Sequence, residues 1–549
     1  MLSIYKMLTP RLGATLLFAA VVAPCALAES PQGAQDAHSH AVAAERLGSV
    51  EFKVECNTAA QGEFNRAMAL YHSFWWPAAA EAFGAVAQAD PTCGMAHWGR
   101  AMVILDNPFT WPANLAPKLK DVSAALEAAR STGLKSQREK DFVEAVAVFV
   151  RDHEKVDHQT RLQAYEQAMA QLAQRYPDDS EAAILSALVT SANFNSADKT
   201  YANQLKAAGA LERFVTSNPN HPGVAHYMIH SYDYPPIAKH GVAAARKYAT
   251  IAPDSPHAQH MPSHIFTRLG YWRESIEANR ASSRVANDAT FDGHHAHDYL
   301  VYAHLQIAQD RAAREALERS RSMKLVDNFA AAYAYAAMPA RLALERSDWK
   351  QAEKLPLTPA ADAYPWKKYP QAEAVNAFAR AIGAARSGNA VSAREQQARL
   401  LALRGAAEEA KLAYWVEQID IQAEIAGALA LCAEGKSGEC IEGMRRAAAR
   451  EDAAEKHVVT PGPILPAREL LADLLLASGQ TGDALQEYEA VLSKEPNRYR
   501  AVLGAARAAT RSGDESRARD LFKQLAELGK DADSDRDGLE EARQSLSRG

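Results

Sequence analysis

Four histidines recur at a fixed interval in the middle of the chain. His226 and His230 are four residues apart, and the same pair returns 34 residues later as His260 and His264. Two residues four apart on one helix lie on the same face, about one turn from each other. If both pairs belong to equivalent helices of stacked repeats, their four imidazoles lie close together. Imidazole is the commonest side-chain metal ligand, so this spacing predicts a metal-binding or ligand-binding site.

Further histidines extend the pattern. His257 precedes the second pair, and an alignment with a six-residue insertion near residues 291–296 matches His297 to His257 and His304 to His264. This alignment predicts a column of His230, His264 and His304 across three successive repeats. Eleven of the 18 histidines lie between residues 221 and 304. Histidine is neither a strong helix former nor a preferred core residue, so the enrichment favours a site over packing.

A transition metal is the expected ligand of these side chains. Neutral imidazole suits Zn, Cu, Ni or Fe, and a nearby carboxylate can complete or orient such a site. Tyr232, Asp233 and Asp298 are the candidates for that supporting role. The predicted metal ligands are His226, His230, His257, His260, His264, His297 and His304.

Pro262 complicates this geometry, because it lies between His260 and His264 and cannot donate a backbone hydrogen bond inside a helix. We therefore expect a helix to begin late there, which leaves His257 and His260 on a turn.

Other functions stay open beside metal binding. A histidine-lined groove can hold a peptide or an acidic ligand by hydrogen bonds, and some of the rings can cap helices or pack against tyrosines. A metal-dependent enzyme would need a base or nucleophile, for which Tyr227, Tyr232, Asp233 and Asp298 are available. The chain has no HExxH, GxSxG or glycine-rich phosphate loop. No catalytic residue is therefore predicted.

Helical repeats must position these side chains. The clearest repeats are C-terminal, where Gly479, Ala484 and Tyr488 are followed at the same interval by Gly513, Ala518 and Phe522. These residues resemble the motif of the tetratricopeptide repeat family, and the resemblance covers most of residues 56–530. It implies an all-α, right-handed superhelical solenoid of helix-turn-helix repeats with a concave surface for a protein or peptide partner. In that family the first helix of each unit lines the groove, which places the histidines on the inner face.

The expected organisation follows from the repeats and the segments between them. A flexible leader at 29–55 precedes an N-terminal array at 56–354, a proline-rich break at 355–372 separates this from a C-terminal array at 373–530, and an acidic tail ends the chain at 531–549. In the tail, Asp533, Asp535 and Asp537 match the opening of a calcium loop, but Gln544 stands where a closing glutamate is expected. A weak calcium site and a solvated tail both remain open.

The N-terminus predicts export. Lys6 and Arg11 precede an apolar run that ends before Ala26-Leu27-Ala28, a pattern typical of a signal peptide at 1–28 cleaved near Ala28. We expect an exported bacterial protein in the periplasm or outside the cell. No later stretch reaches the ~20 apolar residues of a membrane span. The net charge of -6 and pI of about 6.3 argue against a nucleic-acid partner.

The cysteines fit the same compartment. Once the signal peptide is removed, an even number remains, and four cysteines allow three pairings. We expect local pairing, which joins Cys56 to Cys93 and Cys432 to Cys440.

Overall fold

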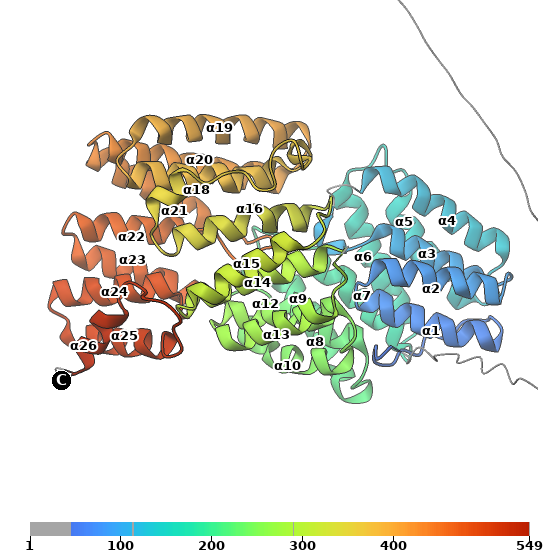
Figure 1. Ribbon diagram of the computed structural model, residues 1–549. Coiled ribbons are helices and arrows are strands. Elements are labelled where there is room, and N and C mark those ends of the chain that lie inside the picture. The colour runs from blue at the N-terminus through green and yellow to red at the C-terminus, as the bar shows by residue number, and fades with distance from the viewer. Residues whose placement is uncertain (1–44, 112–114, 289, 548–549) are drawn as a thin grey trace, which may run out of the picture. The chain divides into compact units, whose positions relative to one another are not determined.

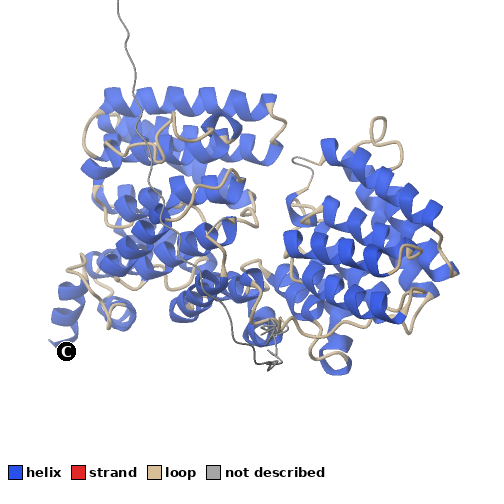
Figure 2. Ribbon diagram, turned by 45° about the vertical axis from the view of Figure 1, so that its right-hand side comes forward, coloured by secondary structure: helices blue, strands red, loops and turns tan. Residues whose placement is uncertain are grey.

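The described part of the chain consists of helices joined by loops and turns (Figures 1 and 2). The computed structural model describes residues 45–111, 115–288 and 290–547, and within these ranges no β-strand occurs. The predicted all-α fold of repeated helix pairs is therefore confirmed. The predicted signal peptide and residues 29–44 of the predicted leader lie outside the described residues.

Among the described residues, eight α-helices precede the histidine-rich segment, and each packs on the next along the chain. Several begin at side chains that accept a backbone N–H of the first turn, including Asn57, Asp157 and the Ser136–Glu139 capping box. These elements are α1 (Thr58–His72), α2 (Trp76–Ala89), α3 (Gly94–Leu105), η1 (Pro108–Thr110), η2 (Ala116–Lys118), α4 (Leu119–Thr132), α5 (Gln137–Val150), α6 (His158–Arg175), α7 (Ser180–Ala192) and α8 (Ala202–Ser217).

Short helices carry the histidines. Prolines stand at the first position of three of them, where a missing N–H costs nothing and the fixed φ suits the helix. Pro262 separates two such helices, so His257 and His260 lie on a helix of their own rather than on the turn that the sequence predicts. The elements are α9 (Pro222–Tyr232), η3 (Ala238–Gly241), α10 (Val242–Ile251), α11 (Pro256–His260), α12 (Pro262–Arg268), α13 (Trp272–Val285) and α14 (Phe291–Gln306).

The C-terminal helices continue the stack. Residues 354–369 contain only η4, and α18 begins at Pro370, inside the segment 355–372 predicted as a proline-rich break. The elements are α15 (Asp310–Ser322), α16 (Phe329–Leu344), α17 (Trp349–Glu353), η4 (Trp366–Lys368), α18 (Pro370–Arg386), α19 (Ala390–Glu409), α20 (Ala413–Ala433), α21 (Ser437–Ala453), α22 (Ala467–Ala477), α23 (Thr481–Lys494), α24 (Tyr499–Ser512), α25 (Glu515–Leu528) and α26 (Leu539–Ser547).

Two hydrophobic cores lie within residues 45–547. The first contains buried apolar side chains from Leu47 to Phe266, and the second contains those from Trp272 to Ala542. The boundary falls between α12 and α13, so α9, α11 and α12 contribute apolar residues to the first core and α14 to the second. Figure 1 shows these helices in green at the middle of the chain. No described helix has the length and apolar character that a membrane crossing requires.

The predicted flexible leader is wrong for residues 45–55. Phe52 is fully buried, and its ring centroid lies 5.2 Å from that of Phe64, 5.3 Å from that of Trp98 and 4.9 Å from that of Phe142. The segment carries few large apolar residues, but Phe52 packs against α1, α3 and α5.

In its described part, the predicted acidic tail packs apolar residues while several of its carboxylates stay exposed. Leu539 and Ala542 of α26 are buried. Asp533 accepts the backbone N–H groups of Arg311 and Ala312 at the start of α15, whereas Asp537 pairs with Arg507 of α24. These two carboxylates, which match positions of a calcium loop, bind different elements of the described chain.

Both predicted disulfides are confirmed. Cys56 pairs with Cys93, which joins the start of α1 to the start of α3. Cys432 pairs with Cys440, which joins the end of α20 to α21.

Candidate metal centre

Three groups of potential ligands converge within the described residues. In each group the ligand atoms all lie within 4.8 Å of one another. We call them the first triad (His226, His230 and His257), the second triad (His260, His264 and His295) and the Glu181 bridge (His72, Glu181 and His221). The hydrogen bonds of the ring nitrogens show which nitrogen of each histidine carries a proton and which has a free lone pair for a metal.

In the second triad, the proton of His260 is fixed on Nδ1. This nitrogen lies 2.7 Å from Oδ1 of Asn279 on α13. The Asn279 amide cannot be turned around, because its Nδ2 donates to the backbone oxygen of Ser275 at 2.8 Å. An amide oxygen only accepts, so His260 Nδ1 donates and His260 Nε2 carries an unprotonated lone pair.

The proton of His264 is likewise fixed on Nδ1, which donates to Oδ2 of Asp233 at 2.8 Å. Burial opposes the charge of Asp233. Nonetheless, Lys456 at 2.7 Å, the His264 N–H and Arg268 at 3.4 Å together hold the pKa of this carboxyl well below its usual range. Asp233 is therefore an ionised acceptor, and His264 Nε2 is also unprotonated.

These two unprotonated nitrogens face each other at 3.0 Å. Burial lowers the pKa values of both rings below 6.5, so a proton shared between them is disfavoured at neutral pH. The Tyr299 hydroxyl, 3.4 Å from His264 Nε2, can donate to that atom, but no donor among the described residues reaches His260 Nε2. Two facing lone pairs repel unless a cation lies between them, and the carboxylate–histidine arrangement is typical of metal sites.

His295 of α14 completes the second triad. Its ring centroid is 4.4 Å from that of His260, and burial lowers its pKa to about 3. The side chain is therefore a neutral imidazole at pH 7, the form that binds metals.

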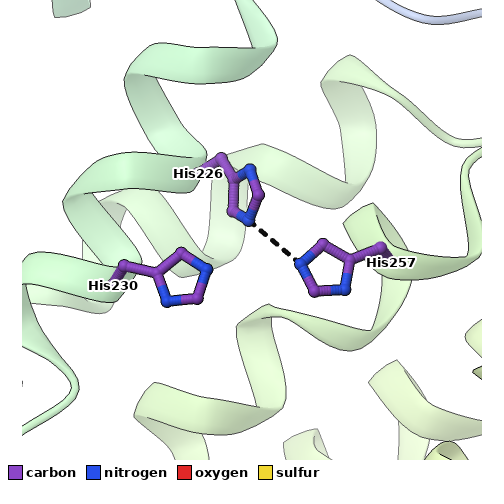
Figure 3. A group of neighbouring side chains, drawn as sticks. All are labelled: His226, His230 and His257. Atoms are coloured by element: carbon purple, nitrogen blue, oxygen red, sulfur yellow. Dashed lines mark hydrogen bonds between the residues drawn. The ribbon is translucent and has the colours of Figure 1, made fainter. Parts of the chain in front are cut away.

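In the first triad, only one of the two facing nitrogens is fixed without a proton (Figure 3). His226 Nδ1 donates to the backbone oxygen of His72 at 2.6 Å, so His226 Nε2 is unprotonated and faces His257 Nε2 at 3.1 Å. His257 can carry its proton on Nε2, which makes this contact an ordinary hydrogen bond. His230 Nε2 remains buried without a hydrogen-bond partner among the described residues. Phe109 stacks on the His230 ring at 4.0 Å.

The hydrogen bonds of the Glu181 bridge form without a metal, and among its ring nitrogens His221 Nδ1 is buried without a hydrogen-bond partner in the described residues. The two oxygens of the buried Glu181 accept from His72 Nε2 at 3.0 Å and His221 Nε2 at 2.7 Å. Burial would raise the pKa of Glu181, but the two histidines hold it well below its usual range. The Tyr227 hydroxyl lies 2.7 Å from His72 Nδ1 and donates to it, and no two lone pairs oppose each other.

Two predicted ligands lie outside both triads. His297 Nδ1 donates to the backbone oxygen of Gly293, and His304 Nδ1 bonds Oε1 of Gln309. On α14, His295 and Tyr299 are four residues apart and share one face, whereas His297 is about 200° around the helix from His295. The predicted column from His230 through His264 to His304 is therefore not formed. The six-residue insertion that the alignment places near residues 291–296 falls within α14.

The supporting residues were predicted in part. Asp233 contacts His264 as expected. Tyr232 instead lies beside His240, with ring centroids 5.8 Å apart, and Asp298 lies 3.6 Å from Arg341. Sequence reasoning missed Asn279, Lys456 and His295. An alignment based on the adjacent pair His294-His295 would have found His295. Lys456 lies 223 residues from Asp233, so no local sequence pattern connects these two residues.

Comparison with known proteins identifies the repeat in one segment. Residues 475–542, from the end of α22 into α26, match the tetratricopeptide repeat family model. The chain matches no curated protein sequence.

Solved structures of tetratricopeptide and other proteins are similar at low identity. The TPR domain of P58(IPK) is 12% identical with a TM-score of 0.21, over 83% of this chain and 99% of that one. Yeast Tom70 is 13% identical with a TM-score of 0.30, over 89% and 88% of the two chains. Human IFIT1 bound to m7Gppp-AAAA is 10% identical with a TM-score of 0.33, over 83% and 89%. Similarity at this level carries no argument about function.

Proposed function

We propose that the second triad binds a transition metal ion through His260, His264 and His295. The observation that carries the proposal is the 3.0 Å approach of two Nε2 atoms whose protons are both committed to Nδ1. No hydrogen bond can form between them in that state, and burial disfavours an added proton. A metal ion accepts both lone pairs and removes the repulsion.

The donor set indicates the class of metal. Three neutral imidazoles suit Zn, Cu, Ni or Fe, and three protein ligands leave one coordination position for water or another small ligand. When bound, the ion would supply Lewis acidity at that position. The chain itself orients His264 through Asp233 and His260 through Asn279, and Asp233 offsets part of the added charge.

Metal-free binding of a protein or peptide partner is the competing function, and a metal-dependent enzyme is a further one. The repeat match at residues 475–542 supports a helical scaffold of the kind that binds partners. Metal analysis separates these functions, because the partner hypothesis requires no bound ion and the enzyme hypothesis requires turnover that a chelator abolishes.

Export to the periplasm belongs to the same proposal. It is supported by the N-terminal sequence pattern and by the two disulfides, which persist in oxidising compartments. The N-terminal residue of the chain recovered from a periplasmic extract tests it. Cleavage near Ala28 is the expected result, and an intact Met1 on all recovered protein would contradict export.

The metal proposal is tested by loading the full chain, without an affinity tag, with Zn²⁺ and measuring the metal content after desalting. The His260→Ala/His264→Ala variant should lose one equivalent relative to the wild type. The His297→Ala/His304→Ala variant is the matched control, because it removes two histidines of the same segment that lie outside the triads. Equal zinc content in the wild type and the first variant would overturn the proposal.

A further inference from the structure

We infer that the first triad binds a second transition metal ion, and that the two triads form one dinuclear centre. This inference rests on the proposed function of the second triad and goes beyond it. It assigns His226, His230 and His257 as ligands and predicts that the two ions are neighbours.

The first argument is the environment of His230. Its side chain is 5% exposed, and its Nε2 atom has no hydrogen-bond partner among the described residues. A buried polar atom left without a partner destabilises the folded state. The hydrogen bond between His226 and His257 satisfies those two rings but does nothing for His230. A metal ion bound by all three rings satisfies each of them.

The second argument is that the ligand atoms are already gathered and oriented. The three rings are held by separate contacts around one space (Figure 3). His226 is fixed by its bond to the His72 backbone oxygen, and His230 is held by the stacked ring of Phe109. The ring centroid of Phe74 lies 4.4 Å from that of His226 and 5.5 Å from that of His257, so an apolar ring borders both ligands. Transfer of the His257 proton from Nε2 to Nδ1 frees its lone pair, because neutral imidazole adopts either tautomer.

The third argument is the position of the triads relative to each other. The ring centroids of His230 and His264 lie 6.3 Å apart, and those of His257 and His260 lie 6.2 Å apart. Each triad therefore contributes rings that contact the other. Six imidazoles and no thiolate select ions that prefer nitrogen ligands, such as Cu²⁺, Ni²⁺ and Zn²⁺.

Cu²⁺ is the probe that tests this inference, because its unpaired spin reports on a neighbouring ion. The full chain is loaded with Cu²⁺, desalted, and examined for copper content and by electron paramagnetic resonance. The expected result is two copper ions per chain with a spin-coupled spectrum, in which the isolated Cu²⁺ signal is strongly reduced. The His226→Ala/His230→Ala variant should hold one copper ion with a full isolated signal. His297→Ala, the control on α14, should match the wild type.

Each other outcome has a distinct meaning. One copper ion in the wild type would overturn the dinuclear centre but leave the proposed function intact, whereas no copper would overturn both. Two ions with two full isolated signals would show that the ions are not neighbours. Two coupled ions retained in the His226→Ala/His230→Ala variant would show that the second ion lies elsewhere. If that variant does not fold, His257→Ala, at a partly exposed position, should lose the coupled signal and keep one ion.

Discussion

Asp233 connects the second triad to Lys456, because its Oδ2 accepts hydrogen bonds from both His264 and Lys456. At the residue scale, the pairing of His226 with His230 and of His260 with His264 was predictable from their spacing. The protonation of each ring was not, because it depends on a partner from another element, such as Asn279. His295 was missed because the alignment placed an insertion near residues 291–296, which belong to α14.

The Asp233→Asn substitution should weaken zinc binding by about 10- to 100-fold, because the amide holds the His264 proton less firmly and removes a compensating charge. Asp298→Asn is the matched control. Asp298 is a buried carboxyl on α14 that contacts Arg341 rather than a triad histidine. Competition titration with a zinc chelator gives both affinities, and an unchanged affinity in Asp233→Asn would contradict the role of Asp233.

His304 should make the metal-free protein less stable in acid. Burial lowers its pKa to about 4, compared with 6.5 when it is unfolded, so the unfolded chain binds more protons between these values. The contribution of His304 is present above pH 6.5 and is lost as the pH falls toward 4. Between pH 7 and pH 5 the resulting loss in the free energy of unfolding is about 2 kcal/mol. Urea unfolding should show a smaller loss over this range in His304→Gln. Parallel pH profiles of the two proteins would rule this contribution out.

The approach of α9 to α1 joins the histidine-rich segment to the N-terminal helices. At the element scale, repeated helix pairs were predictable because alanine, aromatic residues and proline recur at one interval. The close contact of α9 with α1 was not, because it links residues about 150 positions apart. Here the backbone of Gly223 lies against the His72 ring, and a Cβ added at Gly223 would come within 2.7 Å of His72 Nδ1.

The Gly223→Ala substitution should therefore destabilise the protein by about 1–3 kcal/mol, because the methyl group displaces a buried ring that is bonded to Glu181 and Tyr227. Gly209→Ala provides a control of opposite sign. Gly209 lies within α8 with no atom near its added Cβ, so alanine should stabilise the helix by about 0.5–1 kcal/mol. Thermal unfolding followed by circular dichroism measures both, and a neutral Gly223→Ala would contradict the tight packing.

The two triads combine histidines of α9, α11 and α12 with His295 of α14, and these helices contribute to different hydrophobic cores. The segment between α21 and α22 contacts residues beside the triads. Lys456 bonds Asp233, the backbone oxygen of Pro461 accepts from Arg268, and that of Gly462 accepts from Arg341 at 2.8 Å. At the scale of the whole molecule, residues from both halves of the chain thus determine the charge around the triads. Sequence analysis predicted two arrays but could not show this contact, which has no periodic pattern.

The Lys456→Met substitution should have opposite effects on metal affinity and on metal-free stability. Loss of the ammonium removes a positive charge near the ligands, so zinc should bind about 10-fold more tightly. The same change deprives buried Asp233 of one partner and should destabilise the metal-free protein by about 1–3 kcal/mol. Lys494→Met, which breaks a more exposed pair with Asp452, is the control. Weaker zinc binding in Lys456→Met would contradict this electrostatic account.

The most direct test of the central claim is a crystal structure of the zinc-loaded protein with anomalous diffraction data at the zinc edge. We predict an anomalous peak about 2.0–2.1 Å from Nε2 of both His260 and His264, with both Nδ1 hydrogen bonds retained. Zinc found only at surface histidines, with the space between these two rings empty, would contradict it.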